Sequence, residues 1–118
     1  MRDVDSLEED IARTAEVLIR TTGDGGTRGI IGEPRVDASA APIAVDILGA
    51  TLSTTGPELG LGDFQDAVLT FDDGIVVLGR DEASAMLAIV AESGVAAGLL
   101  LNQIRRLLRT RQEAATQR

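Results

Sequence analysis

A β-hairpin signal at residues 66–80, DAVLTFDDGIVVLGR, constrains the fold of this chain more than any other feature. Two apolar runs flank an acidic-glycine turn, and Asp73-Gly74 supplies the residue types that tight hairpins need. The second run, residues 75–78, is apolar at every position, which predicts an inner strand covered on both faces. Residues 84–92 follow this hairpin and are short, so we expect a third strand there, although their Ala, Met and Leu content also suits a helix. The sequence therefore predicts a three-stranded meander over residues 66–92.

Helical periodicity predicts three helices around this meander. The first has apolar residues at helical spacing from Leu7 to Ile19, the second begins at Pro42, which suits a first helical turn, and the third carries a leucine-rich core stripe. We expect these helices at residues 5–21, 42–55 and 94–112, with 113–118 as a frayed tail.

Residues 23–42 form the least regular part of the chain. This stretch is rich in glycine and poor in large apolar residues. Two short strands near 28–32 and 35–38 would make a weak hairpin, and a loop with a single edge strand is the alternative.

The composition limits the classes of function that are open to this chain. A chain of 118 residues suits one domain, and this one has no Cys, no His and no Lys, so thiol chemistry, the usual zinc sites and lysine chemistry are excluded. The net charge of −8 and only two aromatic residues argue against nucleic-acid binding. The apolar stretches are shorter than a membrane span and the N-terminus is acidic, so we expect a cytoplasmic protein without stable membrane insertion. We predict no enzyme activity and no cofactor.

Three motifs could be chemical sites, but their residues suit structural roles better. GDGGTRG at 23–29 lacks the spacing of a phosphate-binding loop. Asp72 and Asp73 suit a solvated turn better than a metal site. The hydroxyls of residues 53–55 have no His or Lys to activate them.

Two surfaces are candidates for partner binding. The helix at 42–55 has a broad apolar face around Gly49 and Ala50, which can serve both the sheet and a partner helix. The last helix gathers cations that suit a helix C-terminus but could also dock an acidic partner. The residues of that strip are Arg105, Arg109 and Arg111.

From Ile43 to Arg111, the chain resembles the roadblock/dynein light chain family. The resemblance rests on the segments IAVDILGATLS, DFQDAVLTFDDGIVVLGRDEASAMLAIVAES and GVAAGLLLNQIRRLLR. It implies a single α+β domain over residues 1–118, an α/β sandwich of roadblock or profilin type with a central antiparallel sheet and helices on both faces. The family's first hairpin would fall at 23–42, where we expect it to be weak or altered.

The resemblance also implies a function. Such proteins are homodimers or heterodimers joined through the second helix and the following strand, and they regulate or scaffold small Ras-like GTPases. The implied dimer and partner residues are Ala44, Ile47, Leu48, Thr51, Leu52, Val68 and Thr70. The alternative is a profilin- or sensor-like module, unrelated to a GTPase, in which residues 23–42 shape a pocket for a small ligand.

Overall fold

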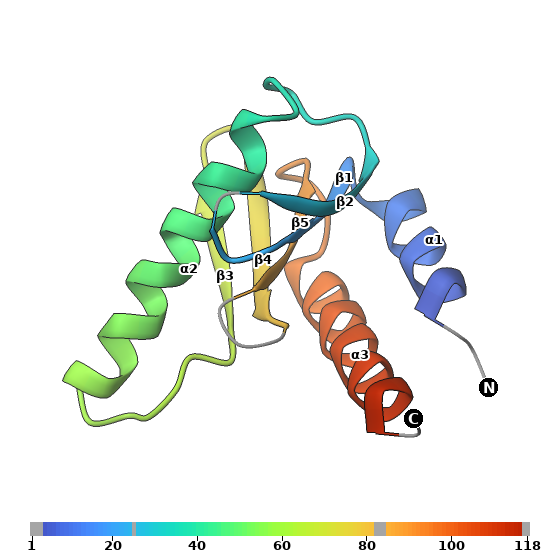
Figure 1. Cartoon of the computed structure of the whole chain (residues 1–118). Coiled ribbons are helices and arrows are strands. Elements are labelled where there is room, and N and C mark those ends of the chain that lie inside the picture. The colour runs from blue at the N-terminus through green and yellow to red at the C-terminus, as the bar shows by residue number, and fades with distance from the viewer. Residues whose placement is uncertain (1–3, 25, 82–84, 117–118) are drawn as a thin grey trace.

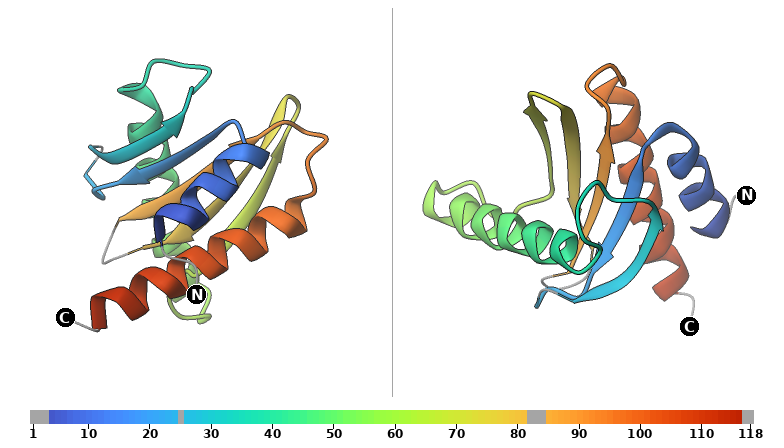
Figure 2. Two further views of the ribbon diagram at one scale, coloured as in Figure 1. Left: turned by 90° about the vertical axis from the view of Figure 1, so that its right-hand side faces the viewer. Right: turned by 90° about the horizontal axis from the view of Figure 1, so that it is seen from above.

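Five antiparallel strands form one sheet at the centre of the protein, in the order β2-β1-β5-β4-β3. The computed structural model describes residues 4–24, 26–81 and 85–116 (Figure 1). Helix α2 covers one face of the sheet, and α1 and α3 cover the other (Figure 2). The strands are β1 (Val17–Thr21), β2 (Thr27–Gly32), β3 (Asp66–Phe71), β4 (Gly74–Arg80) and β5 (Met86–Ala91); the helices are α1 (Val4–Thr14), α2 (Ala40–Glu58) and α3 (Ala97–Thr116).

Alternation along the inner strands gives the sheet two apolar faces. On β4 and β5, Val77, Leu87 and Ile89 pack under α1 and α3. Leu78 and Met86 lie on the opposite face, under α2. The expected fold class, the three-stranded meander and the inner position of residues 75–78 are therefore confirmed. None of the described helices is long and apolar enough to cross a membrane.

The helix predicted at 5–21 is wrong in its second half. α1 ends at Thr14, and β1 begins at Val17. β1 pairs with β2 on one side and β5 on the other, and Val17 and Ile19 face α2 while Leu18 faces α1. A strand buried on both faces has no polar side for a periodicity test to detect, so its apolar residues extended the helical pattern of α1.

The first hairpin that the resemblance implies is present, but not at 23–42. It consists of β1 and β2, so residues 17–32 form it, and the predicted strand near 28–32 is its second arm. Residues 35–38 contain no strand; they lie in the connection to α2. The expectation of a weak or altered hairpin is therefore corrected: the hairpin begins inside the segment that we had predicted as helix.

Smaller boundaries also differ. The two turn residues of the β3–β4 hairpin are Asp72 and Asp73, and Gly74 pairs with Phe71 as the first residue of β4. Gly74 is needed for a close approach instead of a turn, since a Cβ there would lie 2.8 Å from the carbonyl oxygen of Ala91. α3 continues to Thr116, so the tail predicted from 113 is helical as far as that residue. Residues 82–84 and 117–118 lie outside the described part of the chain.

Candidate functional site

α2 is fixed to the sheet by a buried carboxylate in its N-terminal half. Asp46 accepts a hydrogen bond from the Thr21 hydroxyl of β1, and its second oxygen accepts one from the backbone N–H of Gly23 at 3.1 Å. The same Thr21 hydroxyl accepts a hydrogen bond from Met86 N of β5 at 3.0 Å. Buried polar groups need such partners, so this network ties α2 to β1 and β5.

This anchoring leaves the α2 face uncovered along β3 and at the start of β4, although Leu78 further along β4 is buried under α2. The main contacts of α2 are with β1 and β5. Viewed from above, α2 diverges from the sheet toward its C-terminal end (Figure 2). We call the uncovered surface of β3 and β4 on this side the open face.

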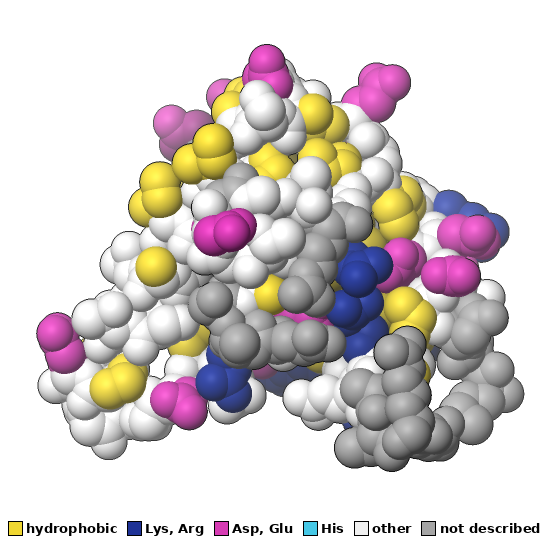
Figure 3. Space-filling view, viewed as in Figure 1, with side chains coloured by type: hydrophobic (Ala, Val, Ile, Leu, Met, Phe, Trp, Pro, Cys, Tyr) yellow, Lys and Arg dark blue, Asp and Glu magenta, His cyan; other side chains and the backbone are white. Residues whose placement is uncertain are grey.

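Exposed apolar side chains border the open face. Ile47 of α2 is 64% exposed, Ile43 is also exposed, and Phe71 at the end of β3 is 57% exposed. Hydrophobic side chains gather along α2 in Figure 3. Two further exposed leucines, Leu59 and Leu61, lie in the loop after α2. Exposed apolar side chains that gather on one side of a protein are candidates for an interaction site.

The predicted interface residues of α2 divide by exposure. Ala44, Ile47 and Thr51 are exposed, whereas Leu48 and Leu52 are half-buried against the core under α2. Thr51 also donates its hydroxyl hydrogen to the carbonyl of Ile47. The outer row of α2 is therefore the part that a partner can reach.

Val68 and Thr70 of β3 do not share a face with α2. They pair with Val77 and Ile75, whose side chains lie in the core under α3. Paired residues in an antiparallel ladder point to the same face, so the β3 side chains on the open face are those of Ala67, Leu69 and Phe71.

The backbone N–H and C=O groups of Val68 and Thr70 point outward from the edge of the sheet, whereas their side chains lie on its α3 face. Gln65 O accepts a hydrogen bond from Arg80 N at 3.1 Å, and hydrogen-bonded pairs alternate along an antiparallel ladder. The backbone groups of residues 67, 69 and 71 therefore point to β4, whereas those of 66, 68 and 70 point outward. β3 is an edge strand, so these outward groups can pair with another strand.

A pocket of about 330 Å³ lies at the end of the open face next to the β3–β4 turn. Its apolar lining includes Phe71, Val76 and Val90, and Arg35 from the β2–α2 connection lies at its rim. Arg35 Nε donates to Glu16 at 2.9 Å, and a second guanidinium nitrogen donates to Asp73 O at 2.8 Å. The hydrogen bond to Arg35 lowers the pKa of Glu16, so the pair stays ionised and holds this rim in place. We call this cavity the Arg35 pocket.

The three arginines of the predicted strip have different partners and different exposure. Arg105 forms a two-point ion pair with Asp66, which raises the pKa of Arg105, and it lies with Arg109 beside a hollow of about 170 Å³. Arg111 instead pairs with Asp81 at 2.8 Å, where both side chains are largely buried. Arg109 is exposed and takes part in neither of these ion pairs. The strip as a docking site stays a prediction, with Arg109 its most available cation.

Groups in two of the three rejected chemical sites are engaged in structural hydrogen bonds. The Gly23 N–H, which a phosphate would need, donates to Asp46, and the hydroxyls of Thr54 and Thr55 donate to carbonyls of their own helix. Among the described residues, no group of three potential ligand side chains could hold a metal ion.

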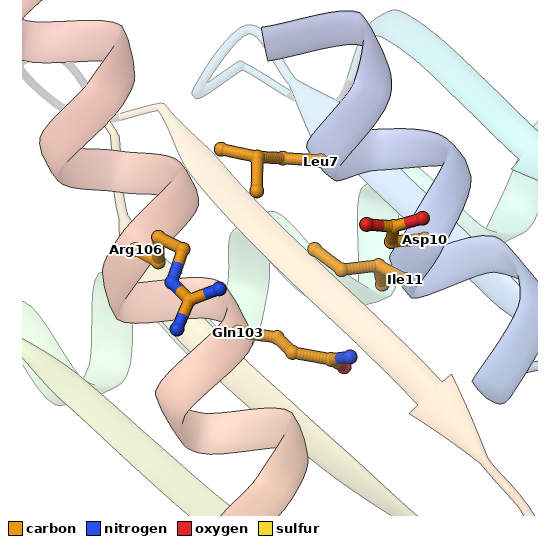
Figure 4. Close-up of a pocket in the computed structure, with 5 residues that line it drawn as sticks. All are labelled: Leu7, Asp10, Ile11, Gln103 and Arg106. Carbon is orange, nitrogen blue, oxygen red and sulfur yellow. The ribbon is translucent and has the colours of Figure 1, made fainter. Parts of the chain in front are cut away.

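A cavity between α1 and α3 is too small for a ligand. It measures about 30 Å³, and Figure 4 shows Gln103 and Arg106 of α3 facing Leu7, Asp10 and Ile11 of α1 across it. That volume corresponds to about one water molecule. The open face and the edge of β3 are therefore the best candidate site.

Sequence reasoning missed Phe71, Leu59 and Leu61. For Leu59 and Leu61 the signal was present in the sequence, because large apolar residues in a glycine-rich loop belong to no periodic pattern that would bury them. Gly60 and Gly62 flank Leu61 with φ of 74° and 84°, which marks a turn rather than a core segment.

Solved structures share this fold over nearly the whole chain. MglB of Myxococcus xanthus matches with a TM-score of 0.84 and 10% identity, covering 98% of this chain and 96% of that one. A Roadblock/LC7 domain of Streptomyces avermitilis matches with a TM-score of 0.81 and 17% identity, covering 98% and 99%. A structure of MglB with a tetrameric arrangement matches with a TM-score of 0.77 and 15% identity, covering 92% and 85%. No protein-family model and no curated protein matches the sequence.

Proposed function

We propose that this chain, which has the roadblock fold, is a non-enzymatic regulator or scaffold that works as a dimer and binds a small Ras-like GTPase. The fold supports a roadblock-type regulator. The resemblance of residues 43–111 to roadblock proteins supports the GTPase as partner, and the tetrameric arrangement of one MglB structure supports self-association of this fold.

The free edge of β3 is the observation that carries the dimer. Its outward main-chain groups belong to Asp66, Val68 and Thr70. If two copies pair antiparallel with Val68 opposite Val68 of the second copy, Asp66 lies opposite Thr70 of the second copy and all the outward groups are used. Any other register leaves some of them unpaired. The sheet would then continue across both copies.

The exposed row of α2 would lie in the same interface. A two-fold axis through Val68 and perpendicular to the sheet keeps α2 of both copies on one side of it. Ile43 and Ile47 of the two helices can then be buried against each other and against the open faces. Burying such side chains is worth about 1.5–3 kcal/mol each.

Sedimentation velocity over a range of concentrations tests the dimer. We expect Ile47→Arg to shift the protein to monomer without lowering its thermal stability in the monomeric state, because Ile47 is exposed. Leu99→Arg is the matched control, since Leu99 is exposed on α3 at the other face of the sheet. A dimer that survives Ile47→Arg but not Leu99→Arg would exclude this interface. Leu48→Arg is a weaker test, because Leu48 is half-buried and its replacement also disturbs the core.

The GTPase is tested by pull-down. The probe is the Ras-like GTPase encoded nearest to this gene, loaded with GDP or with a non-hydrolysable GTP analogue. Binding that depends on the nucleotide supports a regulator, and equal binding supports a scaffold. If neither form binds, the GTPase part of the proposal fails while the dimer stands.

The alternative of a ligand-binding module has one observation in its favour. The Arg35 pocket has a volume at the lower end of the range for small-molecule sites, and Arg35 does come from residues 23–42. Its polar rim is already paired, however, because Arg35 binds Glu16 and Asp73. A small ligand would find few groups to fix its orientation, so we favour a protein occupant.

A further inference from the structure

We propose that the Arg35 pocket is filled by the α2–β3 loop, residues 59–65, of a second copy of this chain, with Leu59 and Leu61 as its contact residues. This inference rests on the proposed dimer and adds to it a reciprocal contact outside the paired strands. Each copy would supply one loop and receive the other.

The register of the β3 edge brings the loop and the pocket together. With Val68 at the two-fold axis, Phe71 lies opposite Gln65 of the second copy. The residues beyond Phe71 are the hairpin turn and the pocket. The residues that precede Gln65 in the second copy are its α2–β3 loop. Antiparallel pairing therefore places the start of one β3 beside the end of the other, and the loop beside the pocket.

The course of α2 is consistent with this placement. Its C-terminal end extends past the edge of β3 instead of lying over the sheet of its own copy (Figures 1 and 2). In the two-fold dimer, that end of α2 and the loop after it would lie near the β3–β4 turn of the other copy. The open face, which α2 of the same chain leaves uncovered, would receive it.

The loop holds its leucines outward in a defined conformation. Leu61 N donates to Gly56 O at 2.9 Å, and Gly60 N donates to Pro57 O at 3.0 Å, so the loop folds back on the end of α2. A Cβ on Gly56 would collide with the carbonyl oxygen of Gly62, which shows how closely the two segments approach. Leu61 is nevertheless 77% exposed and Leu59 67% exposed, the two highest values among the large hydrophobic residues that the structure describes. A preorganised apolar loop costs little entropy to dock.

The pocket offers a matching surface. Phe71 of β3 and Val76 of β4 lie on the open face, Val90 of β5 lies beside Val76, and none of the three is fully buried in the single chain. Arg35, held by Glu16 and by Asp73 O, forms a fixed rim above them. Leucine side chains would remove this apolar surface from water without displacing a polar partner.

Cysteine cross-linking tests the inference directly, because the chain contains no cysteine. Copies carrying Leu61→Cys are mixed with copies of a different tag length carrying Val76→Cys, and the mixture is oxidised mildly. We expect a disulfide between the two sizes. The control mixture pairs Leu61→Cys with Leu99→Cys, which lies on the other face and should give little cross-linking. In parallel, Leu61→Asp should weaken dimerisation about tenfold or more, whereas Leu99→Asp should not.

A third variant separates this inference from the dimer itself. Val68→Cys lies at the proposed axis and should cross-link to itself. If Val68→Cys cross-links while the Leu61 and Val76 pair does not, and Leu61→Asp leaves the dimer intact, the loop contact is wrong and the β3 dimer stands. A chain that stays monomeric at all concentrations overturns both.

Discussion

Gly49 of α2 lies directly over the side chain of Met86 in β5. A Cβ built on Gly49 would come within 2.6 Å of Met86 Cγ and 2.8 Å of its sulfur. α2 therefore rests on the sheet at a glycine, where no side chain separates the helix from Met86. This contact, with the Asp46 network one turn earlier, sets the direction in which α2 leaves the sheet.

We expect Gly49→Ala to destabilise the protein even though alanine is the better helix former. The helix gains up to about 1 kcal/mol, but overpacking against Met86 costs about 1–3 kcal/mol. Gly98→Ala is the matched control, because within the described residues only its chain neighbours and the backbone of its own helix lie within 4 Å of a Cβ at Gly98, and that variant should be neutral or stabilising. Urea denaturation of both variants measures the difference. Gly49→Ala as stable as Gly98→Ala would mean that α2 does not rest on Met86.

The sequence predicted the helices and strands that have one clear hydrophobic period. It misassigned β1, which has none because it is apolar on both faces. The β3–β4–β5 meander was predictable because its turn residues punctuate runs of β-formers. β1 was not, because VLIRT follows α1 after two residues without a Gly or Pro break, and Leu18 continues the spacing of Leu7 and Ile11. Only the pairing with β5, about 70 residues away in sequence, decides that Val17 and Ile19 are extended.

The sequence predicted which helix and strand form the candidate site. It did not predict which face of the sheet the β3 side chains lie on. Periodicity identifies the outer row of α2. It cannot show that Val68 and Thr70 point toward the α3 side, because that depends on register with β4. Nor can it show that Asp46 anchors α2 away from β3, since the partner hydroxyl of Thr21 is 25 residues distant.

Arg111 and Arg109 should respond differently to the same substitution. Arg111→Met leaves Asp81, whose side chain is 4% exposed, without its cation, and we expect a loss of about 3 kcal/mol or more in the free energy of unfolding. Arg109→Met should change stability by less than about 0.5 kcal/mol, because Arg109 is exposed. Chemical denaturation measures both. If Arg109→Met weakens binding of the GTPase while stability is unchanged, the arginine strip acts in docking; equal losses of stability would contradict the division of the strip.

Glu8→Gln should stabilise the protein at neutral pH. Burial between α1, β1 and α3 raises the pKa of Glu8 above its ordinary value of 4.5, although Arg20 and Arg111 act against this; Asp5 and Asp81 add to it. The folded chain therefore binds this proton more tightly than the unfolded chain, so the contribution of Glu8 to stability is complete below pH 4.5 and is lost as pH rises through the raised value. Glutamine, which mimics the protonated acid, avoids that loss.

The pH dependence of the difference is the decisive measurement for Glu8. The stability advantage of Glu8→Gln should shrink as pH falls through the raised pKa and vanish below about 4.5. Glu9→Gln, exposed on the same helix, is the control and should show no such dependence. An advantage that stays constant with pH would show that packing, not ionisation, accounts for it.

Dimerisation should become tighter as salt is added. Each copy carries a net charge of −8, and the proposed register brings the Asp72-Asp73 turn beside Asp63 of the second copy. The Debye length falls from about 30 Å at 0.01 M to about 8 Å at 0.15 M ionic strength, so salt screens this repulsion while the apolar contacts are unaffected. Sedimentation equilibrium in both buffers measures the change. Asp72→Asn should reduce the salt dependence and Asp5→Asn, on α1, should leave it nearly unchanged. A dimer that weakens with salt would be held by ion pairs, and the apolar open face would not be its interface.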